Sequence, residues 1–215
     1  MRARITLTFL VAVLVAGASC QPPPVKGQAH PALRDRPVTK VAVVPLVIAS
    51  RVPTGDPDAG TTAEVAATIV AHQLTEALAA RGIEVIAPSD IGRALEAEGA
   101  ELTQVGPQDA ARLAVEEFGA DAILMGRLLR WVERTGTARA TAVPAAVGFE
   151  VTLRAAPGGR RLWNGIFDEQ QKPLGENVLI TSQYPGGGTR WLTAEELARW
   201  GAGRLVDAIP LDATP

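Results

Sequence analysis

The run V-A-V-V-P-L-V-I-A, residues 41–49, is the clearest strand pattern in the chain. A short run of β-branched and aliphatic residues between turn residues is typical of a strand that is buried on both faces. Pro45 has no amide hydrogen to donate, so it predicts that this strand lies at an edge of its sheet or carries a bulge. The strand is predicted over residues 38–50, and the other elements are placed around it.

Helices and strands alternate after this strand. Thr61-Thr62-Ala63-Glu64 fits a capping box, and the apolar residues behind it recur at helical spacing. The predicted helix ends at Gly82 and buries one side, which carries Val65, Ile69, Leu74 and Leu78. A strand, two helices and a strand are then predicted over 83–87, 88–98, 107–118 and 120–132. This order predicts parallel strands joined by right-handed crossovers, with helices covering the sheet.

The period of the pattern changes in the second half of the chain. Apolar residues alternate with polar or small ones from Val147 to Leu153, which predicts a half-buried strand. The turn residues P-G-G-R, 157–160, lead into a further strand over 162–167. A second capping box, Thr193 to Glu196, opens a predicted helix whose core side carries Leu197, Trp200, Leu205 and Ile209 and which Pro210 ends.

The predicted elements form one α/β domain over residues 38–210. We expect a single three-layer-like arrangement, a mixed sheet of about five strands with helices packed on it. Residues 211–215 are expected to be a tail.

The amino terminus resembles the signal of an exported bacterial lipoprotein. Arg2 and Arg4 precede an uncharged run over residues 5–19, which is too short to cross a bilayer comfortably. The run ends in A-G-A-S-C, residues 16–20, which resembles a lipobox except that Gly17 stands where leucine is preferred. The resemblance implies cleavage after residue 19 and acylation of Cys20. A retained transmembrane anchor and an ordinary signal peptide cut nearby are the alternatives.

Cys20 is the only cysteine, so no disulfide can form within the chain. The Pro-rich stretch that follows it has almost no apolar period, and residues 20–37 are therefore predicted to be a tether. Gln21 stands where an aspartate would signal inner-membrane retention in enteric lipoproteins. The resemblance thus implies an outer-membrane anchor facing the periplasm, with the inner membrane left open.

Charge and composition exclude several function classes. Without Arg2 and Arg4 the chain keeps 19 Lys and Arg against 23 Asp and Glu, so it lacks the basic surface that nucleic-acid binding requires. Its two histidines, His30 and His72, are too few for a metal site of several imidazoles. No G-x-S-x-G is present, and Gly186 to Gly188 lack the Lys and Ser or Thr of a phosphate loop. We expect no catalytic residue, no metal and no cofactor.

The long connection over residues 168–192 is the most informative segment without a regular pattern. Asp168 and Glu169 are neighbours and point to opposite sides of a strand, so surface charge is favoured over a catalytic pair. The apolar residues in the segment either pack back on the sheet or present anchors to a partner. The candidate partner contacts are Leu174, Val178, Tyr184 and Trp191, whereas Trp131, Trp163 and Trp200 are expected in the core.

Three motifs in this order resemble a group of envelope proteins. The motifs are K-V-A-V-V-P-L, G-I-E-V-I-A-P-S-D-I and F-G-A-D-A-I-L-M-G-R-L, which begin at residues 40, 82 and 118. The group comprises CsgG-type secretion lipoproteins, LpoB-type activators of penicillin-binding proteins and TolB amino-terminal domains. The resemblance covers residues 40 to about 167 and implies a periplasmic domain that binds another protein.

Two alternatives to an accessory protein-binding role stay open. A CsgG-type pore subunit would need an inserted hairpin, for which residues 137–147 are the best candidate. An envelope hydrolase would need a pocket that brings His72 beside a buried aspartate. The predicted partners are the membrane, through lipid on Cys20, an unidentified envelope protein, and further copies of the chain as a possible homo-oligomer.

Overall fold

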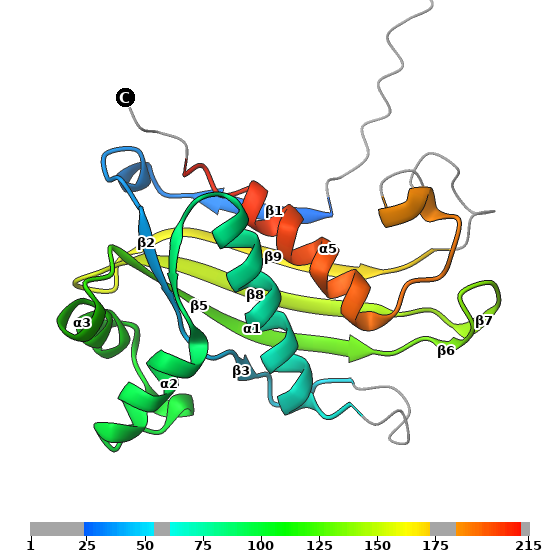
Figure 1. Cartoon of the computed structure of the whole chain (residues 1–215), viewed down its shortest axis with the longest axis horizontal. Helices are drawn as coiled ribbons and strands as arrows, with labels where there is room; N and C mark the ends of the chain where they lie inside the picture. The colour runs from blue at the N-terminus through cyan, green and yellow to red at the C-terminus, as the bar shows by residue number, and fades with distance from the viewer. Residues whose placement is uncertain (1–23, 54–60, 173–183, 212–215) are drawn as a thin grey trace, which may run out of the picture.

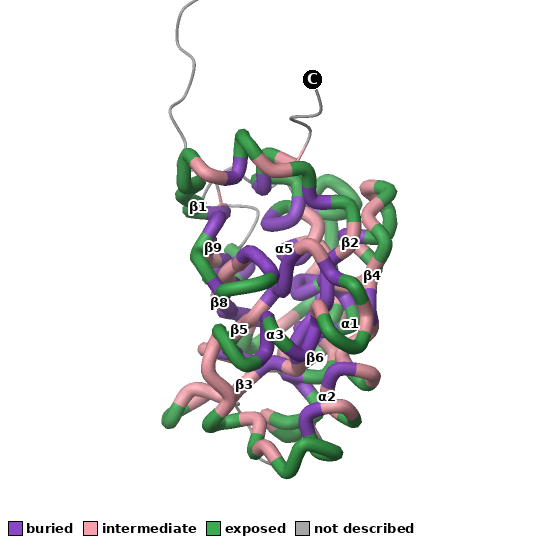
Figure 2. The backbone as a smooth tube through the Cα atoms, turned by 90° about the vertical axis from the view of Figure 1, so that its left-hand side faces the viewer, coloured by how far each residue is buried: buried purple, intermediate pink, exposed green. Residues whose placement is uncertain are grey.

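The computed structural model describes residues 24–53, 61–172 and 184–211. They form three layers, a twisted sheet with two helices on each face (Figure 1). The expected α/β class and the helices packed on a mixed sheet are confirmed. Figure 2 shows the buried residues running through the interior between these layers, whereas the connections at both ends are exposed.

The main sheet has seven strands, in the order β1-β9-β8-β5-β2-β4, and β3 pairs with β5 beyond the end of β2. β2, β3, β4 and β5 run parallel, and β8, β9 and β1 are added antiparallel. A separate pair, β6 and β7, forms a short hairpin between β5 and β8. The strands are β1 (Val25–Ala29), β2 (Lys40–Val43), β3 (Val47–Ile48), β4 (Glu84–Ile86), β5 (Ala122–Val132), β6 (Thr135–Gly136), β7 (Thr141–Val143), β8 (Ala146–Ala155) and β9 (Arg161–Gln170).

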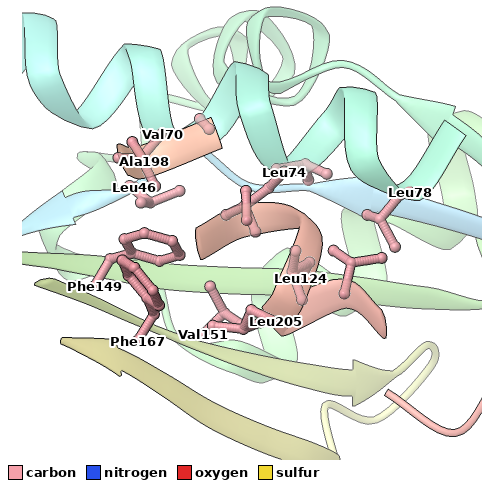
Figure 3. Close-up of a cluster of buried hydrophobic side chains, with 14 of the residues drawn as sticks. Leu46, Val70, Leu74, Leu78, Leu124, Phe149, Val151, Phe167, Ala198 and Leu205 are labelled. Carbon is pink, nitrogen blue, oxygen red and sulfur yellow. The ribbon is translucent and has the colours of Figure 1, made fainter. Parts of the chain in front are cut away.

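Two helices cover each face because successive strand residues point to opposite sides. Val41 and Val43 of β2 face α1 and α5, whereas Ala42 and Val44 face α2 and α3. Figure 3 shows the larger core, in which Leu74 and Leu78 of α1 lie above side chains of the sheet. The helices are α1 (Ala63–Ala80), α2 (Pro88–Ala97), α3 (Pro107–Phe118) and α5 (Ala194–Asp207), with short 3-10 turns at Pro31–Leu33, Leu102–Gln104 and Pro185–Gly188.

The helix ends follow the predicted signals except at the start of α1, where the N-cap is Thr62 and not the Thr61 of the predicted capping box. The Thr62 hydroxyl accepts the amide of Val65 at the start of α1, and Gly82 takes a positive φ of 78° just beyond its end. α5 begins with the complete capping box between Thr193 and Glu196. No helix of the described residues is long and apolar enough to cross a membrane.

The predicted tether is too long. Residues 25–29 form β1, which pairs antiparallel with β9 from Val25↔Phe167 to Ala29↔Trp163. These residues show no periodic apolar pattern because β1 lies at the sheet edge, and four of its five residues are exposed. The folded domain therefore begins about thirteen residues before residue 38, and the sheet has seven strands where about five were expected.

Two further details differ from the sequence prediction. Pro45 was predicted to mark an edge strand or a bulge, but it lies between two separate strands, β2 and β3, and β2 lies inside the sheet between β4 and β5. The helix α1 turns Ala66, Val70 and Leu74 inward, so Val65 is 49% exposed. Alanines make up much of the buried side of α1. The prediction considered large apolar residues only, so it placed the centre of the buried side at a different position around the helix axis.

Three glycines make room for two aromatic rings in the core. The Trp163 indole lies across Gly27 and Gly165, which are register partners on β1 and β9. A Cβ on either glycine would stand 2.7 Å from Cζ2 of the indole. In the same way Gly201 of α5 admits the Phe167 ring, since a Cβ there would stand 2.5 Å from Cε1. Trp131 and Trp163 are buried and Trp200 packs on the core, as predicted.

Candidate functional site

An apolar groove with a volume of about 660 Å³ opens beside β3. We call it the β3 groove. Its walls come from four segments, namely residues 45–48, α1 as far as Thr75, residues 87–96 along α2, and the 3-10 turn at Leu102 and Thr103. The lining residues are Pro45, Leu46, Val47, Ile48, Glu64, Ala67, Thr68, Ala71, His72, Thr75, Ala87, Pro88, Ser89, Gly92, Arg93, Glu96, Leu102 and Thr103.

The groove exists because the sheet narrows at this point. β4 pairs only with residues 40–42 of β2, and β3 pairs with β5 on its other side, so no described strand covers the outer edge of β3. Ala67 and Ala71 of α1 and Gly92 of α2 are too small to fill the space. A second depression, of about 260 Å³, continues across Pro45 and Val47 toward the Arg127–Glu150 ion pair.

The polar groups of the groove are mostly satisfied within the protein. The hydroxyls of Thr68 and Thr75 donate to the α1 carbonyls of Glu64 and Ala71, as side chains in a helix commonly do. Arg93 pairs with Asp90 on the same helix. The groove thus offers an incoming group mainly aliphatic surface with a charged rim, which suits an apolar side chain better than a charged substrate.

His72 lies on the rim of the groove without the surroundings of a catalytic base. Its Nε2 faces Glu76 Oε1 at 3.3 Å, and both side chains are more than half exposed. No aspartate lines the groove, so the buried acid that a hydrolase would need beside His72 is not supplied there. Among the described residues no three His, Cys, Asp or Glu side chains gather to hold a metal ion.

Tyr184 is a structural residue, and its prediction as a partner contact is wrong. The side chain is 3% exposed, its hydroxyl donates to Glu169 Oε1 at 2.6 Å, and its ring packs on Trp200. Burial and the nearby Glu169 carboxylate raise the pKa of Tyr184. Tyr184 therefore packs into the core. Such packing is the alternative to a partner contact that the sequence left open.

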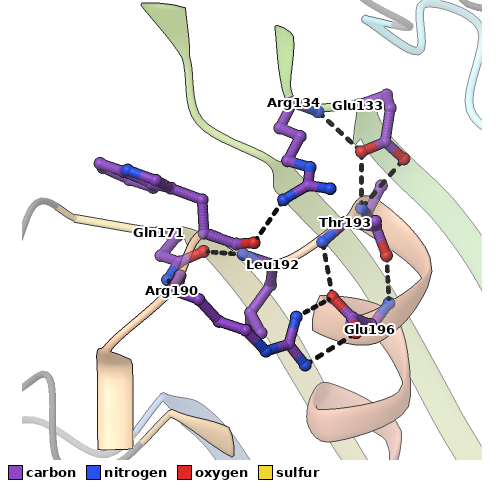
Figure 4. Close-up of polar contacts among 9 residues, drawn as sticks. Glu133, Arg134, Gln171, Arg190, Leu192, Thr193 and Glu196 are labelled. Atoms are coloured by element: carbon purple, nitrogen blue, oxygen red, sulfur yellow. Dashed lines mark hydrogen bonds and ion pairs between the residues drawn. The ribbon is translucent and has the colours of Figure 1, made fainter. Parts of the chain in front are cut away.

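Trp191 is half-buried and leaves part of its surface open. Its amide donates to Ala138 of the hairpin, and its carbonyl accepts from Arg134. Gln171, buried at 3% exposure, accepts the Leu192 amide and donates to the Arg190 carbonyl (Figure 4). Trp191 is therefore held firmly at the end of the sheet. The other two candidates, Leu174 and Val178, lie outside the described residues.

Three carboxylates near Trp191, those of Asp168, Glu169 and Glu133, each have a partner within the protein. Asp168 pairs with Arg130, and Glu169 accepts from Tyr184 on the other side of β9. The expected absence of a shared site between them follows from this geometry. Glu133 accepts the amide of Ala194 at the start of α5, where a negative charge is favourable.

Glu196 titrates unusually low. Two hydrogen bonds from Arg190, at 2.7 and 2.8 Å, lower its pKa; partial burial opposes them and the Thr193 amide adds to them, so that the pKa falls to about 2. Since an unfolded glutamate titrates near about 4.3, the stabilising contribution of Glu196 is present above that pH and is lost as the pH falls toward 2.

We expect the free energy of unfolding to fall more steeply for the wild type than for Glu196→Gln when the pH is lowered from about 5 to about 3. Glutamine keeps the capping geometry but cannot titrate, so it removes the ion pair at every pH. Denaturant unfolding across this pH range measures the difference. If the free energy of unfolding fell equally with pH for the two proteins, the lowered pKa of Glu196 would be contradicted.

The sequence showed one signal for the β3 groove, the proline inside a buried strand. Pro45 predicted an edge strand or a bulge, but nothing local indicated that β4 would end early or that two helices would leave space beside it. The groove depends on how far β4 pairs along β2 and on where α1 and α2 lie. No single sequence motif determines either of these.

Comparisons with known proteins found no matching family model and no matching curated protein. Among solved structures, the chain is similar to the PelC dodecamer from Paraburkholderia phytofirmans, with 21% identity, a TM-score of 0.48, and coverage of 89% of this chain and 98% of that one. It is also similar to lipoprotein GNA1162 from Neisseria meningitidis, with 19% identity, a TM-score of 0.41, and coverage of 66% and 87%.

A third similar structure is the LpoB C-terminal domain from Salmonella enterica, with 16% identity, a TM-score of 0.39, and coverage of 63% of this chain and 85% of that one. LpoB-type proteins belong to the group that the three sequence motifs resemble, and the likeness to CsgG and TolB types stays a prediction. At these values the likenesses carry no conclusion about what the chain does.

Proposed function

We propose that the chain is a lipid-anchored accessory factor of the bacterial envelope that binds an aliphatic segment of another envelope protein in the β3 groove and catalyses no reaction. The observation that carries the proposal is the groove itself, which is open, mainly aliphatic and built on rigid elements. Its polar groups are engaged locally, and His72 on its rim faces an exposed Glu76. The lipobox-like sequence before Cys20 supports the anchor.

The anchor is tested on the mature protein from native membranes. Mass spectrometry is expected to find an acylated Cys20 at the amino terminus, and Cys20→Ala is expected to release the protein from the membrane fraction. A single myristoyl-like chain binds only marginally, but several acyl chains on one cysteine hold stably. An unmodified protein that fractionates away from membranes would remove the lipoprotein assignment and its outer-membrane placement together.

Binding in the groove is tested by placing a photo-crosslinking amino acid at Thr68, which is exposed on the groove wall. The matched control is Ala80, an exposed residue at the other end of the same helix. We expect position 68 to give a crosslinked envelope protein several-fold more efficiently than position 80. Val47→Lys should abolish that product, because an ammonium group would stand in the apolar groove.

The thermal unfolding midpoint of Val47→Lys must stay close to that of the wild type, which shows that the loss of the crosslinked product is not caused by unfolding. Equal crosslinking at positions 68 and 80 would contradict a role for the groove. A product that contains two copies of this chain would instead favour self-association, as in the alternative of a ring-forming secretion subunit. Size analysis of the detergent-solubilised native protein distinguishes a monomer or dimer from a large ring.

A further inference from the structure

The distance between Cys20 and the folded domain limits how the domain can sit on a membrane. Val25 is fixed in the sheet, because β1 pairs with β9 and the Val25 side chain is 7% exposed. Five residue steps join Cys20 to Val25, and a fully extended chain spans at most about 3.6 Å per residue. Cys20 therefore lies no more than about 18 Å from Val25, whatever path the chain takes.

This reach extends just past one end of the sheet. Val25 stands level with Phe167, which is opposite Phe149 and, one strand further, Leu128. β5 continues from Leu128 to Val132, which adds about 13 Å at about 3.3 Å per residue. Cys20 can thus pass the end of β5 by about 5 Å at most. A membrane that holds its acyl chains must lie close to this end or along the exposed edge of β1.

The end of the sheet within reach is suited to lipid. We call it the hairpin end; it comprises the β6–β7 hairpin, residues 135–143, together with Lys172 and Trp191. Val143 is 43% exposed, and it is one of two large hydrophobic side chains in the described residues that are exposed. Trp191 is half-exposed and is held against the hairpin by its hydrogen bond to Ala138. Tryptophan favours the boundary between lipid and water.

The charges of the hairpin end also favour a lipid surface. Arg139 and Lys172 are exposed, and cations of this kind are attracted to anionic headgroups. The nearby carboxylates have partners in the protein, since Glu133 caps α5, Glu169 accepts from Tyr184 and Glu196 pairs with Arg190. The edge of β1, by contrast, exposes Lys26, Gly27, Gln28 and Ala29, none of which is a large apolar residue.

We infer that the hairpin end rests on the headgroup region of the membrane, with Val143 and Trp191 against the lipid and Arg139 and Lys172 against anionic headgroups. This inference depends on the lipid anchor of the proposed function. Figure 1 shows β1 and β3 at opposite edges of the molecule, with the β6–β7 hairpin at one end. The β3 groove then opens beside the membrane and is not covered by it.

The test uses the acylated mature chain in vesicles of phosphatidylethanolamine and phosphatidylglycerol. Because Cys20 is the only native cysteine and its thiol is acylated, Val143→Cys accepts an environment-sensitive fluorophore selectively. Ala80→Cys, exposed at the opposite end of the sheet, is the matched control. With a quencher carried on the lipid, the loss of fluorescence at position 143 is expected to be several-fold larger than at position 80.

Charge reversal provides a second arm. Arg139→Glu combined with Lys172→Glu is expected to reduce the quenching at position 143 on these anionic vesicles. The reduction should be absent on vesicles of neutral lipid. Equal quenching at positions 143 and 80 in protein that floats with the vesicles overturns the orientation and leaves the anchor intact. Acylated protein that does not float with the vesicles overturns the anchor of the proposed function instead.

Discussion

Gly201→Ala is expected to lower the free energy of unfolding by about 1–3 kcal/mol, although alanine is the better helix former. The new Cβ would stand 2.5 Å from the Phe167 ring, which is fully buried. The ring cannot move without disturbing its neighbours, because it packs on Phe149 with 5.3 Å between centroids and on Trp200 with 5.7 Å. Either α5 or the ring must shift, and both lie at the centre of the larger core.

Gly203→Ala is the matched control, two residues further along the same helix. A Cβ at Gly203 meets nothing within 4 Å, so the substitution is expected to stabilise the protein by about 0.5–1 kcal/mol. Denaturant unfolding of the two variants measures both changes. Effects of the same sign would show that helix propensity, and not the contact with Phe167, decides the outcome.

Trp163→Ala is expected to cost about 3–5 kcal/mol, the largest effect of the single substitutions considered. The side chain is 1% exposed and lies across Gly27 and Gly165, so its removal leaves a cavity on the face of the sheet that β1 and β9 share. Because β1 pairs with β9 alone, we expect the cavity to loosen β1 first. Unfolding free energy and amide exchange of residues 26–29 measure the two effects.

A double-mutant cycle separates the contact from the general cost of losing a tryptophan. Gly165→Ala alone should destabilise, since its Cβ would overlap the indole. In the Trp163→Ala background the same substitution should be neutral or stabilising, because the overlap is gone and alanine restricts the unfolded chain. Additive effects of the two substitutions would sink the interpretation that the glycines exist to admit the indole.

The parts of the fold that follow from local chemistry could be predicted from the sequence. The capping box at Thr193 and the glycine after α1 are decided by a few neighbouring residues, and each is found where expected. β1 was missed for the opposite reason. Its residues become a strand only because β9 offers an unpaired edge and two facing glycines make room for Trp163.

The candidate site was less accessible to prediction than the fold. Tyr184 and Trp191 are both aromatic residues in one irregular segment, yet Tyr184 turns inward to Glu169 and Trp191 stays half-exposed. That difference depends on which ring finds a partner within the fold; the Tyr184 ring packs on the partly buried Trp200 of α5. The β3 groove likewise results from where β4 ends, which is a property of strand pairing and not of any residue in the groove.

The pairing of β1 with β9 has a mechanical consequence. If Cys20 is anchored as proposed, a pull on it would enter the domain at Val25, and a pull along the strands would load the β1–β9 hydrogen bonds in shear. These bonds run perpendicular to antiparallel strands, so they must give way together, whereas a pull away from the sheet edge would open them one at a time. The Trp163 indole contacts both strands, so it opposes their sliding past each other. We therefore expect the domain to resist unfolding under tension applied along the strands at its amino-terminal end.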